Sequence, residues 1–218
     1  MTARTFRALA RSVRRAAASS ALALAAVVLV AGCSITRPAP VKTMFLIDPP
    51  APAAAAQAQP ATLRVGTVNV AAPFRGRTFI YRDSDLRFQT DYYAEFVVAP
   101  AAMIGESTAR ALDRAGVFAR VVPPGAPPEG DYVLDGFVSA LYGDVREPAK
   151  PAAEVAVTFY LSRADAGMGA PLWSKEYRRR AAVGSPVPES YAAALSSAFG
   201  EIYAELARDL ATVKLPRK

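Results

Sequence analysis

The segment Glu154–Ser162 limits the possible folds of this chain more than any other segment. Large apolar side chains occupy every second position in it, and small or polar-tipped side chains lie between them. The large apolar members are Val155, Val157, Phe159 and Leu161. A period of two places these side chains on one face of a strand and the intervening ones on the other. Such a strand belongs to a sheet with one covered face and one open face. The rest of the chain must therefore supply a covering layer.

A long helix near the C-terminus is the first candidate for that layer. Its expected range is Glu189–Val213, and its apolar stripe consists of Leu195, Phe199, Ile202, Leu206, Leu210 and Val213. Steps of three and four residues keep this stripe on one side of a helix. A second helix is expected between Pro100, which suits a first helical turn, and Gly116, which suits a C-terminal cap. We therefore predict an α+β fold: a mixed, largely antiparallel sheet with two helices packed on one face.

Further strands are expected wherever short β-prone runs lie between proline- and glycine-rich turns. Their ranges are Val41–Ile47, Leu63–Val70, Arg77–Tyr81, Val117–Val122, Tyr132–Tyr142 and Leu172–Arg180.

The first 32 residues have the composition of an export signal. Five arginines and no acidic residue occupy positions 1–15, and a run of sixteen mostly apolar residues follows over Ala16–Ala31. Sixteen residues are fewer than the roughly 20 that a membrane-spanning helix needs. A secretory signal peptide is therefore favoured over a membrane anchor helix.

That segment ends in Val30-Ala31-Gly32-Cys33, which resembles the lipobox of bacterial lipoproteins. The resemblance implies that the thiol of Cys33 receives a diacylglyceryl group and that the signal is cut just before it. Ser34 follows, where an aspartate commonly retains lipoproteins at the inner membrane, so the outer membrane is the expected destination, with the domain on its periplasmic face.

The domain organisation follows from this signal and from a change in composition near residue 61. Residues 1–32 are predicted to be the lipoprotein signal peptide. Residues 33–61 are predicted to be a lipidated tether rich in proline and alanine that contains a short first strand. Residues 62–218 are predicted to form a single α+β domain.

The positive charge of the chain belongs mainly to the signal. The full sequence has 26 basic and 19 acidic side chains, a net charge of +7. Removal of residues 1–32 takes away five arginines and leaves 21 basic side chains, a net charge of +2. Nucleic-acid binding therefore loses its main support, and no nucleic-acid partner is expected.

Several kinds of chemistry are excluded by composition. The chain has no histidine and one cysteine, so it cannot build a Ser-His-Asp triad, an imidazole zinc site or a Cys-x-x-Cys pair. It also lacks the glycine-rich phosphate loops of nucleotide-binding proteins. The remaining candidate catalytic groups are the carboxylates Asp83, Asp85, Asp91 and Glu95, which alternate with arginines as solvated surface charges do. We expect neither an enzyme nor a cofactor or metal site.

The segment Phe79–Phe96 combines six aromatic side chains with several charges. One interpretation is an edge strand and a turn whose aromatic side chains complete the core. The other is a surface that recognises a partner, because Tyr and Arg offer large contact areas with hydrogen-bonding tips. The candidate partner-binding residues are Tyr81, Arg82, Tyr92, Tyr93, Glu95 and Phe96. The run Arg178–Arg180 is a further cluster that could meet anionic headgroups or remain solvated.

Taken in order, these features resemble the ABC-type transport auxiliary lipoproteins, the PqiC-like lipoproteins of Gram-negative bacteria. The resemblance covers about residues 41–213. It rests on the lipobox, the aromatic strand after it, Ile80-Tyr81-Arg82, Tyr92–Phe96 before Pro100, the junction Leu112–Phe118 and the alanine-rich last helix. Phe96 and Phe45 stand where the family often has Trp and Tyr.

The resemblance implies a non-enzymatic accessory role at the outer membrane. The implied partners are a mammalian-cell-entry (MCE) domain protein and the permease and ATPase of an ABC system that moves lipids between the two membranes. A homo-oligomer would suit docking to a multimeric partner. The alternative is a structural or assembly lipoprotein that binds an envelope protein or cell-wall polymer.

Overall fold

The computed structural model describes residues 41–127, 129–167 and 169–216. The chain divides into two units, Met1–Val41 and Lys42–Lys218, and the second unit, called the domain below, contains all the helices and strands described here. The predicted signal peptide, Cys33 and Ser34 lie outside the described residues.

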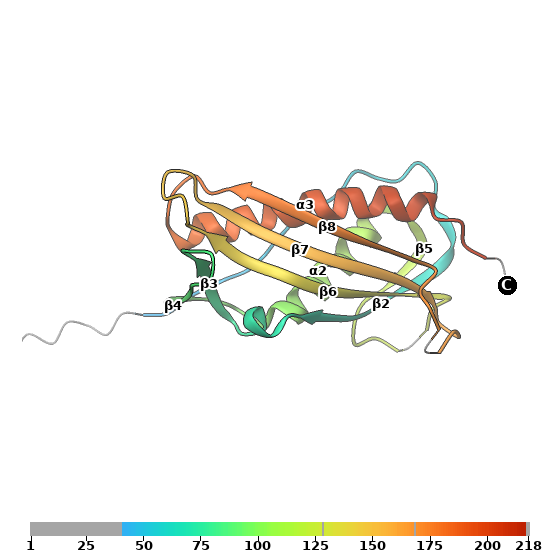
Figure 1. The fold of residues 1–218 in the computed structure, drawn as a ribbon. Helices are drawn as coiled ribbons and strands as arrows, with labels where there is room; N and C mark the ends of the chain where they lie inside the picture. The colour runs from blue at the N-terminus through green and yellow to red at the C-terminus, as the bar shows by residue number, and fades with distance from the viewer. Residues whose placement is uncertain (1–40, 128, 168, 217–218) are drawn as a thin grey trace, which may run out of the picture. The chain divides into compact units, whose positions relative to one another are not determined.

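Eight strands of the domain form one sheet (Figure 1). They are β1 (Thr43–Phe45), β2 (Gln59–Val70), β3 (Thr78–Arg82), β4 (Phe88–Phe96), β5 (Phe118–Val122), β6 (Tyr132–Asp144), β7 (Ala152–Arg163) and β8 (Trp173–Ala182). A short 3-10 helix, η2 (Ala72–Phe74), links β2 to β3.

The long strand β6 organises this sheet. One of its edges pairs with β7 in antiparallel register along nearly its whole length, and β8 extends the sheet beyond β7. The other edge is shared, because β2 pairs with the first half of β6 and β3 pairs with its last two residues, both in parallel. β5 then adds to β2, while β4 and β1 add to β3. The branch β3-β4-β1 therefore lies at the end of the domain where β6 terminates.

Two helices, α2 (Pro100–Ala115) and α3 (Pro188–Thr212), cover one face of the sheet (Figure 1). Their ends lie within a residue of the predicted ones. Gly116 caps α2 with φ of 62°, a left-handed conformation that glycine adopts without strain. The predicted fold class is thus confirmed: a mixed sheet, largely antiparallel by paired residues, with both helices on one side.

Packing between the helices and the sheet follows the two periodicities of the sequence. The alternating apolar side chains of β7 are fully buried, and so are Phe199, Ile202 and Leu206 of α3. Between the helices, the buried hydroxyl of Tyr203 lies 2.7 Å from Ser107 Oγ and accepts a hydrogen bond of 3.2 Å from Thr108 Oγ1. This bonding satisfies a polar group that would otherwise be buried without a partner.

The segment before β2 packs on the domain. Ile47 is completely buried, and the Ala55 amide donates to the Ala115 carbonyl at 2.7 Å. Pro50 lies so close to α3 that a Cβ on Gly200 would be 2.5 Å from its ring. Residues 42–61, placed in the tether by composition, therefore belong to the same compact unit as the predicted domain. Their small and cyclic side chains suit this close approach as well as they suit a tether.

Candidate functional site

The candidate partner-binding residues all lie on β3 and β4, but the structure distributes them between core and surface. Phe96 is buried, with its ring centroid 4.5 Å from that of Phe79. Tyr81 packs edge-on against Tyr191, with the ring centroids 4.7 Å apart, and its hydroxyl donates a hydrogen bond of 3.4 Å to the Asp91 carboxylate. Burial, followed by the charge of Asp91, raises the pKa of Tyr81. Both aromatic side chains therefore contribute mainly to packing.

Arg82 stabilises the turn between β3 and β4. Its guanidinium donates to the carbonyl of Ser84 at 3.2 Å and to that of Asp85 at 2.7 Å. Across the same turn, Arg87 Nε donates to Asp83 at 2.8 Å, and this bond lowers the pKa of the Asp83 carboxyl. The turn is thus held by its own charged side chains.

Tyr92, Tyr93 and Glu95 remain at the surface of β4, beside the edge strand β1. Tyr92 and Tyr93 contact each other with ring centroids 5.0 Å apart. Glu95 accepts a hydrogen bond of 2.7 Å from Arg77 and lies 3.9 Å from Lys42. Of the six candidate residues, these three are brought together on one exposed surface.

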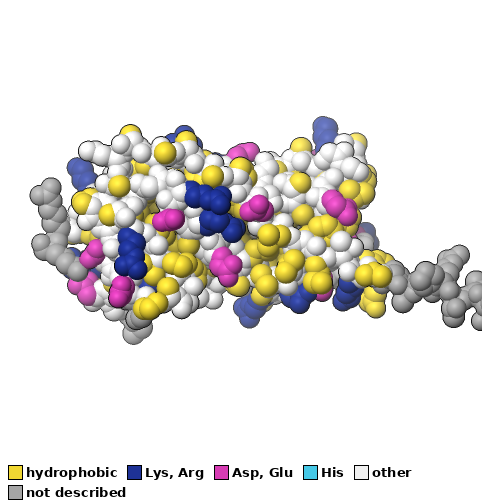
Figure 2. Space-filling model, turned by 180° about the vertical axis from the view of Figure 1, so that it is seen from behind, with side chains coloured by type: hydrophobic (Ala, Val, Ile, Leu, Met, Phe, Trp, Pro, Cys, Tyr) yellow, Lys and Arg dark blue, Asp and Glu magenta, His cyan; other side chains and the backbone are white. Residues whose placement is uncertain are grey.

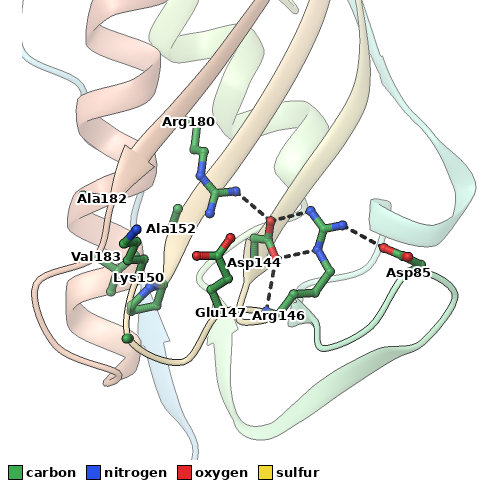
Figure 3. A pocket seen from close by; sticks show the side chains of 11 residues that line it. Asp85, Asp144, Arg146, Glu147, Lys150, Ala152, Arg180, Ala182 and Val183 are labelled. Atoms are coloured by element: carbon green, nitrogen blue, oxygen red, sulfur yellow. Dashed lines mark hydrogen bonds and ion pairs between the residues drawn. The ribbon is translucent and has the colours of Figure 1, made fainter.

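A polar cavity of about 850 Å³ lies at the end of β6, between the β3–β4 turn, the β6–β7 turn and the end of β8 (Figure 3). One of the residues that line it is Asp144, which is only 2% exposed. The Asp144 carboxylate accepts hydrogen bonds from Arg146 at 2.8 and 3.0 Å and from Arg180 of β8 at 2.7 Å. Arg146 also donates to Asp85 in the β3–β4 turn at 2.9 Å. We call Asp85, Asp144, Arg146 and Arg180 the Asp144 cluster.

The electrostatics of this cluster indicate a structural role. Hydrogen bonds from Arg146 and then from Arg180 hold the pKa of Asp144 well below its usual range. Arg180 also donates to Glu154 at 2.6 Å, so both guanidinium groups are already bonded to carboxylates of the chain. The cluster ties β6, β8 and the β3–β4 turn together.

The run Arg178–Arg180 is divided by the alternation of β8. Arg179 points to the helix layer, where it pairs with Glu205 and lies 3.2 Å from Glu201, both on α3. Arg180 joins the Asp144 cluster, and Arg178 donates to Glu176 at 3.0 Å. The three side chains therefore do not form one basic patch.

The four carboxylates considered for catalysis are also engaged. Asp83 and Glu95 pair with arginines, Asp85 belongs to the Asp144 cluster, and Asp91 accepts hydrogen bonds from the amides of Tyr93 and Ala94. General acid catalysis needs a raised carboxyl pKa, whereas that of Asp83 is lowered. Within the described residues, no group of three or more Cys, Asp or Glu side chains is arranged to hold a metal ion.

The described part of the chain also contains no helix with the length and apolarity needed to cross a membrane.

Two solved structures share the fold at low sequence identity. A DUF330-family protein from Xanthomonas campestris has a TM-score of 0.67 at 20% identity, covering 76% of this chain and 92% of its own. A second crystal structure, of an uncharacterized protein, has a TM-score of 0.60 at 15% identity, covering 78% and 99%. A PelC dodecamer from Paraburkholderia phytofirmans is less similar, with a TM-score of 0.43 at 22% identity, covering 74% and 94%.

Comparison with protein families gives a more specific result. No curated protein is detectably similar to the chain in sequence. The family model described as the ABC-type transport auxiliary lipoprotein component matches residues 45–210, which is well over half of the chain. The match confirms the resemblance inferred from the residues. The chain belongs to the ABC-type transport auxiliary lipoprotein family.

Proposed function

We propose that the protein is a lipid-anchored, non-enzymatic accessory subunit of an ABC-type transport system that moves lipids between the inner and outer membranes through an MCE-domain protein. The observation that carries this proposal is the family match over residues 45–210. The engaged carboxylates of the β3–β4 segment are consistent with an accessory role, because they are held in ion pairs and backbone hydrogen bonds.

The proposed anchor is Cys33, the single cysteine of the chain, at the end of the lipobox-like sequence. One acyl chain gives only marginal membrane attachment, whereas each buried CH₂ group contributes about 0.8 kcal/mol, so two or three chains hold a protein firmly. The domain begins at Lys42, eight residues after Ser34, and would be carried on this anchor.

We propose further that Ser34 directs the protein to the outer membrane, with the domain on the periplasmic side. Ser34→Asp is expected to shift most of the protein to the inner-membrane fraction, because aspartate after the lipidated cysteine acts as a retention signal in this class of protein. Density-gradient separation of the two membranes measures the shift, and Ser34→Ala is the matched control that should stay in the outer-membrane fraction. An unchanged distribution of Ser34→Asp would contradict the sorting proposal.

The partner proposal is tested by purification. The acylated protein, tagged at its C-terminus and extracted in mild detergent, is expected to retain an MCE-domain protein, which mass spectrometry identifies. The control is an unrelated outer-membrane lipoprotein with the same tag, which should retain none. Recovery of an envelope protein or cell-wall polymer without any MCE-domain protein would instead support a structural or assembly lipoprotein, and would end the transport proposal.

A further inference from the structure

Large side chains that would normally be buried are exposed where β1 joins β4. Met44 is 56% exposed, Leu46 53%, Tyr92 72%, Tyr93 47% and Val97 44%. We call these five residues, together with Lys42, the β1–β4 patch. Isolated apolar residues on a surface need no explanation, but several together indicate an interaction site. Hydrophobic and basic side chains are visible together at this end of the domain, on the right in Figure 2.

The pairing of β1 with β4 brings the members of the patch together. Lys42 Nζ lies 5.5 Å from the centroid of the Tyr92 ring, which in turn contacts Tyr93. The Val97 amide donates to the Phe45 carbonyl at 3.0 Å, which places the end of β4 beside β1. Phe45 itself points inward, with its ring centroid 5.2 Å from that of Phe79. The patch is thus the outer surface of a packed strand pair.

Lys42 of the patch and the neighbouring Arg77 surround the carboxylate of Glu95. Arg77 donates to Glu95 at 2.7 Å and to the Met44 sulfur at 3.4 Å, and Lys42 lies 3.9 Å from the same carboxylate. Around Glu95, two cations therefore face one anion, and both cationic side chains remain about half exposed. The other carboxylate nearby, that of Asp91, accepts hydrogen bonds from the amides of Tyr93 and Ala94. Such a surface can approach anionic phosphate groups without repulsion.

The length of chain before the patch limits what can lie against it. Residues 34–41 are all that separates Cys33 from Lys42. An extended chain advances at most about 3.3–3.6 Å per residue, so these residues span no more than roughly 30 Å. Strand β6, which pairs with β2, β3 and β7, is by comparison about 40 Å long. With Cys33 acylated, the β1–β4 patch must remain close to the bilayer surface.

We propose that the β1–β4 patch rests on the headgroup region of the membrane that holds the Cys33 anchor. Tyrosine is suited to this region because its ring enters the apolar boundary while its hydroxyl stays hydrated. Met44, Leu46 and Val97 bury apolar surface there, and Lys42 and Arg77 meet phosphate groups. This inference rests on the proposed acylation of Cys33.

A weak intrinsic affinity is sufficient for this contact. A short tether holds the patch near the bilayer at a high effective concentration, so binding becomes an intramolecular step. The contact would fix which end of the domain faces the membrane. The opposite end, which carries the β7–β8 turn, then points away from it.

A pair of matched cysteine positions tests the proposal. Acylation converts the Cys33 thiol to a thioether, so a newly introduced cysteine is the only reactive thiol. Leu46→Cys in the patch and Leu172→Cys beside the β7–β8 turn replace leucines of similar exposure. Each full-length acylated variant is labelled with an environment-sensitive fluorophore and reconstituted in vesicles of phosphatidylethanolamine and phosphatidylglycerol. Nitroxide-labelled lipid in the same vesicles is expected to quench the label at position 46 several-fold more than the label at position 172.

A second pair of variants separates the tyrosines from general effects on the fold. Tyr92→Ser combined with Tyr93→Ser is expected to reduce quenching at position 46 several-fold. Phe137→Ser combined with Tyr160→Ser, two exposed aromatic residues on the uncovered sheet face, should leave it unchanged.

Two results would overturn the proposal while the anchor stands. The first is equal quenching at positions 46 and 172. The second is protection of position 46 only after an MCE-domain protein is added, with no quenching by lipid, which would assign the patch to a protein partner. If Cys33 itself reacts with the label and the protein fails to remain with the vesicles, the anchor is missing, and both this inference and the proposed anchoring fail together.

Discussion

Replacing Cys33 with alanine is expected to move the protein from the membrane fraction to the soluble periplasmic fraction. The sulfur of Cys33 is the atom that would carry the diacylglyceryl group, and the sequence contains no second cysteine to replace it. Loss of two or three acyl chains removes far more binding free energy than the β1–β4 patch can supply by itself, because each buried CH₂ group contributes about 0.8 kcal/mol. Cell fractionation with palmitate labelling measures both effects.

The adjacent variant Ser34→Ala is the control for this experiment. It changes the neighbouring side chain but leaves the thiol, so it should be labelled and remain in the membrane fraction. The folded domain begins at Lys42, so the unfolding transition of Cys33→Ala in urea should match that of the wild type. Equal palmitate labelling of wild type and Cys33→Ala, or none in either, would refute the lipoprotein assignment.

The sequence predicts the two layers of this fold because each layer has its own periodicity. The strict alternation of Glu154–Ser162 appears as β7, whose apolar face is buried under the helices. The stripe of the last helix appears in α3, and five of its six members are buried. Val213 lies just past the end of α3 and is partly exposed. Local patterns of this kind are readable because they depend on neighbours three or four residues away at most.

The arrangement of the strands depends on contacts that no local pattern reveals. β2 and β3 share one edge of β6, and this requires both to run parallel to a strand more than 50 residues later. Strand β4 lies within a segment whose aromatic residues suit either core or surface, and the structure uses them for both, with Phe96 inside and Tyr92 outside. Single residues in such a segment cannot be assigned before the register of the strands is known.

The Asp144 cluster was missed for the same reason. Asp144 lies two residues past the end of the predicted strand Tyr132–Tyr142, Arg180 ends the predicted strand Leu172–Arg180, and the two residues are 36 apart in the sequence. Only the antiparallel registers of β6 with β7 and of β7 with β8 bring the two side chains together. The opposite charges of Glu154 and Arg180, which lie directly opposite each other on β7 and β8, could have indicated the cluster. This pairing can be recognised only when the register of β7 with β8 is known.

Asp144→Asn is expected to lower the free energy of unfolding by about 2–3 kcal/mol at pH 7. The substitution keeps the shape of the side chain but removes the charge that binds Arg146 and Arg180. Removing one member of a fully buried ion pair costs about 3–5 kcal/mol. Here the two guanidinium groups are partly exposed, so water compensates part of the loss. Urea unfolding followed by circular dichroism measures the difference.

Glu147→Gln, in the same cavity, is the matched control, for which a change below about 0.5 kcal/mol is expected.

The pH dependence of this difference distinguishes charge from shape. Hydrogen bonds from Arg146 and Arg180 hold the pKa of Asp144 well below its usual range, whereas an unfolded aspartate has a pKa of about 3.9. The carboxylate therefore contributes its full stabilisation above that pH, and loses it as the pH falls toward the folded-state pKa. The difference between wild type and Asp144→Asn should be constant from about pH 5 to pH 7 and become smaller below about pH 4. A difference that stays the same at pH 3 would show that packing, and not the charge of Asp144, holds the β3–β4 turn to β6 and β8.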